Sequence, residues 1–276
     1  MRARHLLLCT LLLVLAACSG ARDGDRTSND TTMTEQTFAR YLALGDSISI
    51  DSYPAHDVER RYPGKASTDA LGAASLLYRN DDKLWPEFRG NDLHAKFPSL
   101  AFDDLTADGA TTRSLLAQVS RIARSDEPTL VTITAGGNDL LGEIGFRGSP
   151  QDGGDTPVPA IAGRLRDAVT QLLALRPHSV VIVSTVYDPS DGTNRLPGYS
   201  RPLEREAQWL RDYNDAVRQL AASDRRLRLA DIQQHFMGHG LTVPESQRWY
   251  LAESIIEPNA RGASEVRRLW LQAIAR

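Results

Sequence analysis

The stretch Tyr41-Leu-Ala-Leu-Gly-Asp-Ser-Ile-Ser49 decides the fold of this chain. Its apolar run, residues 41–44, is typical of a buried parallel strand, and Gly45-Asp46-Ser47 is typical of the turn that ends one. Glycine permits a tight turn there, and open α/β sheets bind ligands at the carboxyl ends of their strands. The sequence therefore predicts a serine presented at a ligand-binding edge, although a serine that caps the next helix would give the same tripeptide.

Strand-like apolar runs alternate with helical patterns over the rest of the chain. The predicted strands are residues 40–44, 97–102, 130–134, 179–186 and 227–230, and the predicted helices are residues 112–125, 160–175, 203–222 and 263–275. Strands that alternate with helices of this length favour βαβ crossovers. We therefore expect an α/β fold with a mostly parallel five-stranded sheet.

Residues 50–96 make a long connection that is rich in Tyr, Pro, Gly, Asp and Arg. A connection of this length inside a compact domain usually covers a site or is disordered. The aromatic residues Trp85 and Phe88 near its end, and a short helix-like run at residues 70–78, favour an ordered segment. We expect it to cover the active site at the carboxyl edge of the sheet and to select the substrate.

The N-terminus has the pattern of a secretory leader. Arg2 and Arg4 precede an apolar stretch, residues 6–17, which is shorter than the span of about 20 residues that a membrane helix needs. Leu15-Ala-Ala-Cys18 is similar to a bacterial lipobox, in which the cysteine is acylated and becomes the mature N-terminus. The alternative is ordinary cleavage that leaves Cys18 free.

Three segments follow from this pattern: a signal peptide (1–17), a lipidated Cys18 with a polar, disordered tether (18–36), and one domain (37–276). Loss of the leader removes two arginines, so the formal charge changes from −3 to −5. No run of Lys or Arg indicates a nucleic-acid partner. We expect a monomer held by its lipid anchor on the periplasmic or surface face of a bacterial cell envelope, with the outer membrane as one location.

Two further segments repeat the pattern of a small polar residue near a strand end. Asp108-Gly-Ala-Thr-Thr-Arg113 places a glycine before a predicted helix, and Gly136-Gly-Asn-Asp139 follows the predicted strand 130–134. Together with Ser47, these segments resemble the first three blocks of the SGNH/GDSL hydrolases over residues 39–275. The resemblance implies a three-layer α/β/α fold. It also implies Ser47 as the nucleophile, with an oxyanion hole made by the backbone N–H groups of Ser47 and Gly109 and the side chain of Asn138.

The fourth block of the family, an Asp-x-x-His pair before Pro, is altered in this chain. The matching stretch is Ser254-Ile-Ile-Glu257-Pro258-Asn259-Ala-Arg-Gly262, so Glu257 stands at the histidine position and Ser254 at the aspartate position. In one account Glu257 is the general base, because a carboxylate has no tautomer for an aspartate to fix. In a second account a histidine from elsewhere is the base and Glu257 is its acid partner. In a third the base is lost, and the domain only binds a glycan or lipid.

His239 is the best histidine for the second account, because it lies in a glycine-flanked loop after the last predicted strand. His235 is the next candidate. His178 opens a strand at the opposite end of the sheet, and His56 and His94 belong to the expected cover. A packing or surface role is the ordinary alternative for each of them.

We therefore predict a serine esterase that acts through Ser47 on an acyl ester, such as an acetylated glycan, a lipid or a small ester. The alternatives are an O-acyltransferase that uses the same site and a non-catalytic binding module. No metal-ligand spacing of His, Cys or carboxylates is present, so we expect no cofactor.

Overall fold

The computed structural model describes residues 37–145 and 156–276. The predicted signal peptide, Cys18 and the tether lie outside these residues. Within them, five strands form one sheet in the order β2-β1-β3-β4-β5, and every neighbouring pair is parallel. The strands are β1 (Arg40–Gly45), β2 (Ala101–Asp104), β3 (Thr129–Thr134), β4 (Ser179–Ser184) and β5 (Leu227–Ala230). The parallel five-stranded sheet was predicted and is confirmed.

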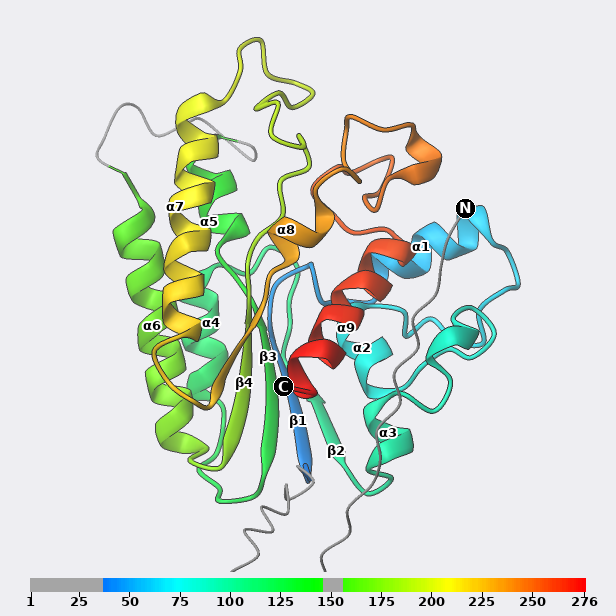
Figure 1. Ribbon diagram of the computed structural model, residues 1–276, viewed down its shortest axis with the longest axis vertical. Coiled ribbons are helices and arrows are strands. Elements are labelled where there is room, and N and C mark those ends of the chain that lie inside the picture. Colours follow the sequence, from blue (N-terminus) through cyan, green and yellow to red (C-terminus); the bar gives the residue numbers. More distant parts are fainter. Residues whose placement is uncertain (1–36, 146–155) are drawn as a thin grey trace, which may run out of the picture. The chain divides into compact units, whose positions relative to one another are not determined.

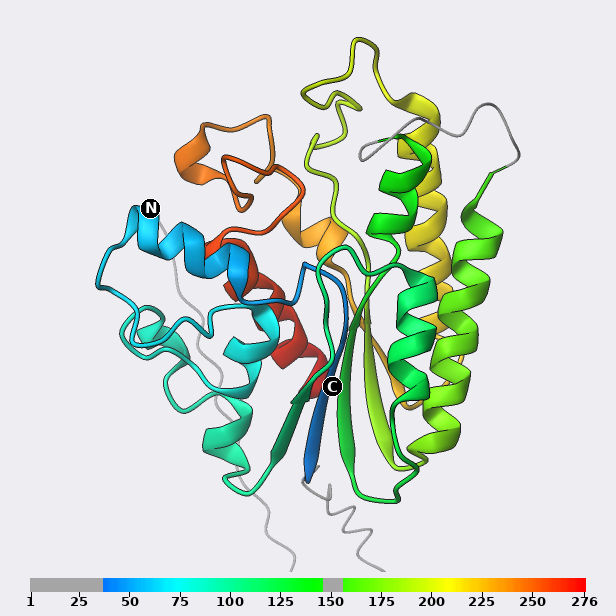
Figure 2. The ribbon, with the colours of Figure 1, turned by 180° about the vertical axis from the view of Figure 1, so that it is seen from behind.

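Helices cover both faces of this sheet, as Figures 1 and 2 show from opposite sides. One layer contains α4 (Thr112–Ser120), α5 (Gly137–Glu143), α6 (Val158–Leu175) and α7 (Glu204–Ala221). The other contains α1 (Ser52–Arg61), α2 (Ala73–Tyr78), α3 (Leu93–Lys96), α8 (Ile232–Phe236) and α9 (Ala260–Ile274). Two short 3-10 helices, η1 (Pro86–Phe88) and η2 (Glu245–Gln247), lie in the connections. The predicted three-layer α/β/α architecture is therefore confirmed.

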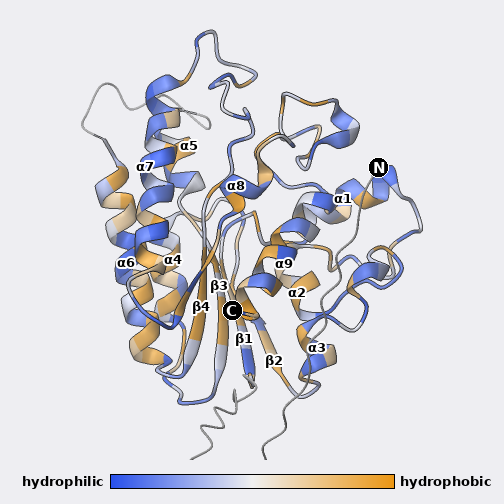
Figure 3. Ribbon diagram, viewed as in Figure 1, coloured by the Kyte–Doolittle hydropathy of each residue, from blue (hydrophilic) through white to orange (hydrophobic). Residues whose placement is uncertain are grey.

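The two faces of the sheet have separate cores because side chains alternate along each strand. In β1, Leu42 and Leu44 pack with α4, α6 and α7, whereas Tyr41 and Ala43 pack with α2 and α9. Figure 3 shows the apolar colouring of the strands between the two helical layers. No helix among the described residues is long and apolar enough to cross a membrane.

Several predicted boundaries shift for local reasons. The second strand begins at Ala101 rather than at residue 97, because Phe97 ends α3 and its carbonyl accepts from the Leu100 N–H in a turn. The last helix begins at Ala260 because Asn259 caps it, its side chain accepting from the Gly262 N–H at 2.9 Å. Helix α4 ends at Ser120, five residues earlier than predicted.

The expectation for residues 50–96 needs correction. The segment is ordered, but it builds α1 and α2 against α9, and α3 against α2, on one face of the sheet. Its apolar side chains form a small core of their own with Ala260, which includes Val58, Leu76, Trp85 and Phe88. None of residues 50–96 lines the pocket that contains Ser47. Trp85 and Phe88, the aromatic residues that suggested a cover over the active site, instead pack in this small core.

Candidate active site

Ser47 lies in the turn that directly follows β1, and glycine at position 45 makes that turn possible. Gly45 has a φ of +119°, and a Cβ on it would lie 1.8 Å from the carbonyl oxygen of Thr134. The Gln118 side chain holds this residue, accepting from the Gly45 N–H at 2.8 Å and donating to its carbonyl at 3.0 Å. The turn is therefore fixed on β3 and α4, and it presents a buried Ser47 at the carboxyl edge of the sheet.

Asn138 lies in the first turn of α5, next to the loop that carries Gly109. Its side-chain Nδ2 donates to the carbonyl of Ala110 at 3.1 Å, which ties it to the residue after Gly109. Gly109 has a φ of +70°, in the left-handed region that favours glycine. Gly109 itself does not line the pocket that contains Ser47 and Asn138. Gly136, rather than Asn138, is the N-cap of α5.

Asp139 locks these two segments together. Its carboxylate accepts from the N–H and the hydroxyl of Thr112, both at 2.7 Å, and from Arg164 at 2.9 Å. Thr112 begins α4 directly after the Gly109 loop, and Arg164 belongs to α6. The carboxylate therefore holds the loop of Gly109 beside α5, and with it the side chain of Asn138.

Glu257 lines the same pocket as Ser47 and Asn138, and only 2% of its surface is exposed. Its backbone is held on both sides: the N–H donates to the Ser254 carbonyl at 3.0 Å, and the carbonyl accepts from the Leu251 N–H at 2.9 Å. Pro258 pairs with Tyr250 in an isolated β-bridge. The altered fourth block thus brings a buried carboxylate to the pocket of the serine.

His239 lies elsewhere. Its ring stacks on Trp249 with centroids 3.6 Å apart, and it lines a different pocket, together with Trp85 and Arg61. His235 Nε2 lies 2.9 Å from a carboxylate oxygen of Glu265, an ion-pair geometry when the ring is protonated. Neither histidine lines the pocket of Ser47. The structure therefore brings together Ser47, Asn138 and Glu257, with Gly109 adjoining, but not His239.

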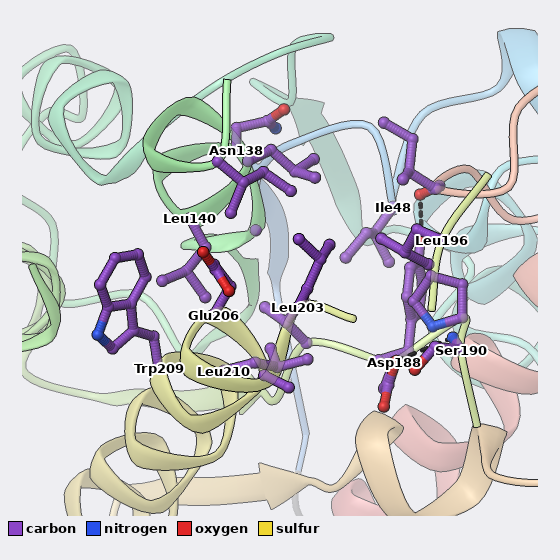
Figure 4. A pocket seen from close by; sticks show the side chains of 18 of the residues that line it. Ile48, Asn138, Leu140, Asp188, Ser190, Leu196, Leu203, Glu206, Trp209 and Leu210 are labelled. Carbon is purple, nitrogen blue, oxygen red and sulfur yellow. Dashed lines mark hydrogen bonds between the residues drawn. The ribbon is translucent and has the colours of Figure 1, made fainter. Parts of the chain in front are cut away.

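The pocket of Ser47 lies between α5, the N-terminal half of α7 and the connection from β4 to α7 (Figure 4). Its empty volume is about 880 Å³, with the open solvent at its mouth included. Its walls are mainly apolar, and the side chains that form them include Leu140, Ile144, Leu196, Leu203, Ala207, Trp209 and Leu210. Apolar walls of this kind suit an apolar chain.

Four carboxyl groups line this pocket, those of Asp46, Asp188, Glu206 and Glu257. Asp188 accepts from the backbone N–H groups of Ser190 and Gly192, and Glu206 is paired with Arg201. Arg201 accordingly lowers the pKa of Glu206. Asp46 directly precedes Ser47 in the chain, and Glu257 lines the same pocket from the segment before α9.

Asp46 is almost completely buried, and this burial raises its pKa to about 6. The hydroxyl of Thr134 and the backbone N–H of Ile48 oppose the increase by hydrogen bonding to the carboxylate. Burial also raises the pKa of the Tyr187 hydroxyl well above its usual value, and the nearby charges of Glu257 and Asp46 add to that increase. Tyr187 donates to the carbonyl of Ile256 at 2.7 Å, directly beside Glu257.

Sequence reasoning missed the connection between β4 and α7, which supplies much of this pocket. Residues 185–203 leave the carboxyl end of a central strand, and several of them line the pocket. The same signal that drew attention to residues 50–96, a long connection at this edge, is present here too. Pocket-lining residues on α7, such as Trp209, gave no signal beyond that of an amphipathic helix.

A parallel sheet with helices on both faces, and a pocket lined by a serine, an asparagine and a carboxylate, places this chain among the α/β proteins. The model of the GDSL-like lipase/acylhydrolase family matches residues 43–264, and the chain belongs to that family. It is accordingly an ester-hydrolysing enzyme, as predicted. No curated protein matches the sequence.

Solved structures with the same fold include an extracellular lipase from Streptomyces rimosus, at 20% identity and a TM-score of 0.57, covering 85% of this chain and 99% of that one. A mutant of the acetyl-xylooligosaccharide esterase Axe2 from Geobacillus is 18% identical, with a TM-score of 0.58 and coverage of 87% and 97%. Phospholipase A1 from Streptomyces albidoflavus is 20% identical, with a TM-score of 0.54 and coverage of 86% and 98%.

Proposed function

We propose that this enzyme hydrolyses carboxylic esters through a covalent acyl-enzyme on Ser47. The Ser47 oxygen attacks the carbonyl carbon of the ester while its proton passes to Glu257, the buried carboxylate of the same pocket. The same group then returns the proton to the departing alkoxide. Water, deprotonated in the same way, releases the acid and restores the serine.

The negative charge that develops on the carbonyl oxygen needs hydrogen-bond donors to stabilise it. We assign this role to the backbone N–H groups of Ser47 and Gly109 and to the amide of Asn138. One N–H of that amide is used by the Ala110 carbonyl, and the other remains for the substrate. A donor of this kind typically contributes about 2.7–4 kcal/mol to the stabilisation of the transition state.

We further propose that the acyl group is an apolar chain longer than acetyl. The observation that supports this is the apolar wall of the Ser47 pocket, formed by α5, α7 and the 185–203 connection. Each buried CH₂ contributes about 0.8 kcal/mol, so a chain of several carbons would gain considerably over acetate in such a pocket. A lipid or another long-chain ester fits this pocket better than an acetylated sugar.

A series of nitrophenyl esters from acetate to octanoate tests this proposal. We expect kcat/KM to rise on the order of tenfold or more with chain length, since each added CH₂ is buried against leucine side chains. Ala207, half-buried on the pocket wall, offers a way to close the pocket: Ala207→Trp should abolish the preference for octanoate and spare acetate. Gln208→Trp, exposed on the same helix, is the matched control and should keep the full preference. A flat chain-length series with the unaltered enzyme would refute the apolar acyl site.

We also propose that the enzyme is anchored by a lipid on Cys18 at the bacterial cell envelope. The support is the sequence alone: a short apolar leader, small residues before the cysteine and a polar stretch after it. Intact-mass analysis of the membrane fraction should find a mature chain that begins at an acylated Cys18, and Cys18→Ala should remain unprocessed or be released. A mature N-terminus without acyl mass would contradict the anchor.

A further inference from the structure

A second groove shares none of its lining residues with the Ser47 pocket. It is bounded by the end of α1, residues 83–85, the loop 238–249 and the start of α9, with an empty volume of about 1270 Å³ that includes open solvent. Asn259 lines this groove, whereas Glu257, two residues earlier, lines the pocket of the serine. Figures 1 and 2 show α1, the loop before α9 and α9 itself at this end of the molecule.

The groove is strongly basic, although the chain as a whole has a formal charge of −3. Five cationic side chains line it, against a single carboxylate; they are Arg61, Lys65, Lys83, Arg248 and Arg261. The carboxylate, Asp57, is buried and neutralised by Arg61, whose Nε lies 2.7 Å away. We call this cavity the basic groove.

Three of these cations have no carboxylate partner among the described residues, and one of them, Arg248, donates through Nε to the carbonyl of Val243 at 2.9 Å. Lys65, Lys83 and Arg248 form no ion pair with any residue in the described part of the chain. Both lysines are exposed. Positively charged side chains that gather in a concave surface make the local electrostatic potential more positive, which favours binding of an anion.

Aromatic rings line the basic groove together with the cations. Tyr62 is 47% exposed, and the rings of His239 and Trp249 are stacked on each other. Ser246 and Gln247, both exposed, add polar side chains that can bind hydroxyl groups. Aromatic faces beside cations and hydrogen-bonding groups suit a ligand that has an apolar ring face, hydroxyl groups and a negative charge.

We propose that the basic groove binds an anionic saccharide, with its acid groups on Lys65, Lys83 and Arg248 and a sugar ring against Tyr62. A membrane surface is a poorer match, because insertion needs a cluster of exposed apolar side chains. Among the described residues, only Tyr62 and Met237 are large hydrophobic side chains with high exposure. Binding in the basic groove requires none of the residues that line the Ser47 pocket.

Calorimetric titration of the full chain tests this proposal, with Ser47→Ala as the background so that no ester is turned over. The probes are two anionic saccharides, a tetramer of galacturonic acid and a heparin-derived tetrasaccharide, with neutral maltotetraose for comparison. We expect at least one anionic probe to bind and the neutral one not to bind. Lys65→Glu combined with Lys83→Glu should weaken binding by about tenfold or more, because two attractive charges become repulsive.

The matched control is Lys96→Glu combined with Arg121→Glu. These two residues are also exposed, lie outside the basic groove and make no ion pair with a described residue, so the net charge changes equally. Tyr62→Ala should weaken binding further without unfolding the chain. The proposal is overturned if neither anionic saccharide binds, if maltotetraose binds as well, or if the control pair loses as much affinity. Binding of phosphatidylglycerol vesicles in place of both saccharides would likewise overturn it, in favour of a lipid headgroup.

Discussion

Ser47→Ala should abolish ester hydrolysis, with kcat/KM reduced by a factor on the order of 10³ or more, because the covalent step loses its only nucleophile. The change removes one hydroxyl from a turn that is held by Gly45 and Gln118, and neither of these contacts involves the serine side chain. The melting temperature should therefore remain within a few degrees. Hydrolysis of nitrophenyl esters and labelling by a fluorophosphonate probe are the two measurements, and both should be lost together.

Ser190 provides the matched control, since it is the other serine that lines the pocket. Its hydroxyl accepts from the backbone N–H of Asn194 and has a structural role. Ser190→Ala should keep both labelling and most of the turnover. Labelling that persists in Ser47→Ala would show that another serine is the nucleophile.

The fold and the positions of Ser47 and Asn138 could be predicted because the sequence patterns that indicate them are local. Apolar runs identified all five strands, and Ser47 and Asn138 each follow a strand directly in sequence. In the sheet order β2-β1-β3-β4-β5, β2 lies on one side of β1, and the later strands β3, β4 and β5 lie on the other side. The strand order therefore switches between β1 and β3, the two strands that precede Ser47 and Asn138. Because parallel strands end at the same edge of a sheet, residues that directly follow these strands lie at that edge.

The histidine could not be placed in this way, because contacts distant in sequence fix its loop. The carboxylate of Asp191 accepts from the backbone N–H groups of Gly238, Gly240 and Thr242, which pins the loop around His239. Stacking on Trp249 then holds the ring in the basic groove. Neither partner is predictable from the sequence around His239, so its place after the last strand does not decide which of the two pockets its ring lines.

Glu257→Gln should reduce kcat by about 10²–10⁴-fold, which is the usual contribution of a general base. Glutamine keeps the size of the side chain but cannot accept the serine proton, so KM should change little and the enzyme should remain folded. His239→Ala should retain most of the activity, since the ring lines the basic groove rather than the Ser47 pocket. If His239→Ala were instead the more damaging change, the histidine account would be restored. If both variants remained active, Glu257 would be no part of the chemistry.

The pH profile of kcat/KM distinguishes Asp46 from Glu257, the two carboxyl groups in the Ser47 pocket whose titration bears on the base. A carboxylate base is active when ionised, so the rate should fall as the pH falls through its pKa. Asp46 affects how this acidic limb of the profile is interpreted. Burial raises the pKa of Asp46 to about 6, close to the range of an ordinary histidine. An acidic limb near pH 6 therefore does not identify an imidazole in this enzyme. Asp46→Asn resolves the ambiguity, because an asparagine oxygen can still accept from the Ile48 N–H but does not titrate. The limb should persist in Asp46→Asn if Glu257 is the base, whereas its disappearance would assign the titration to Asp46.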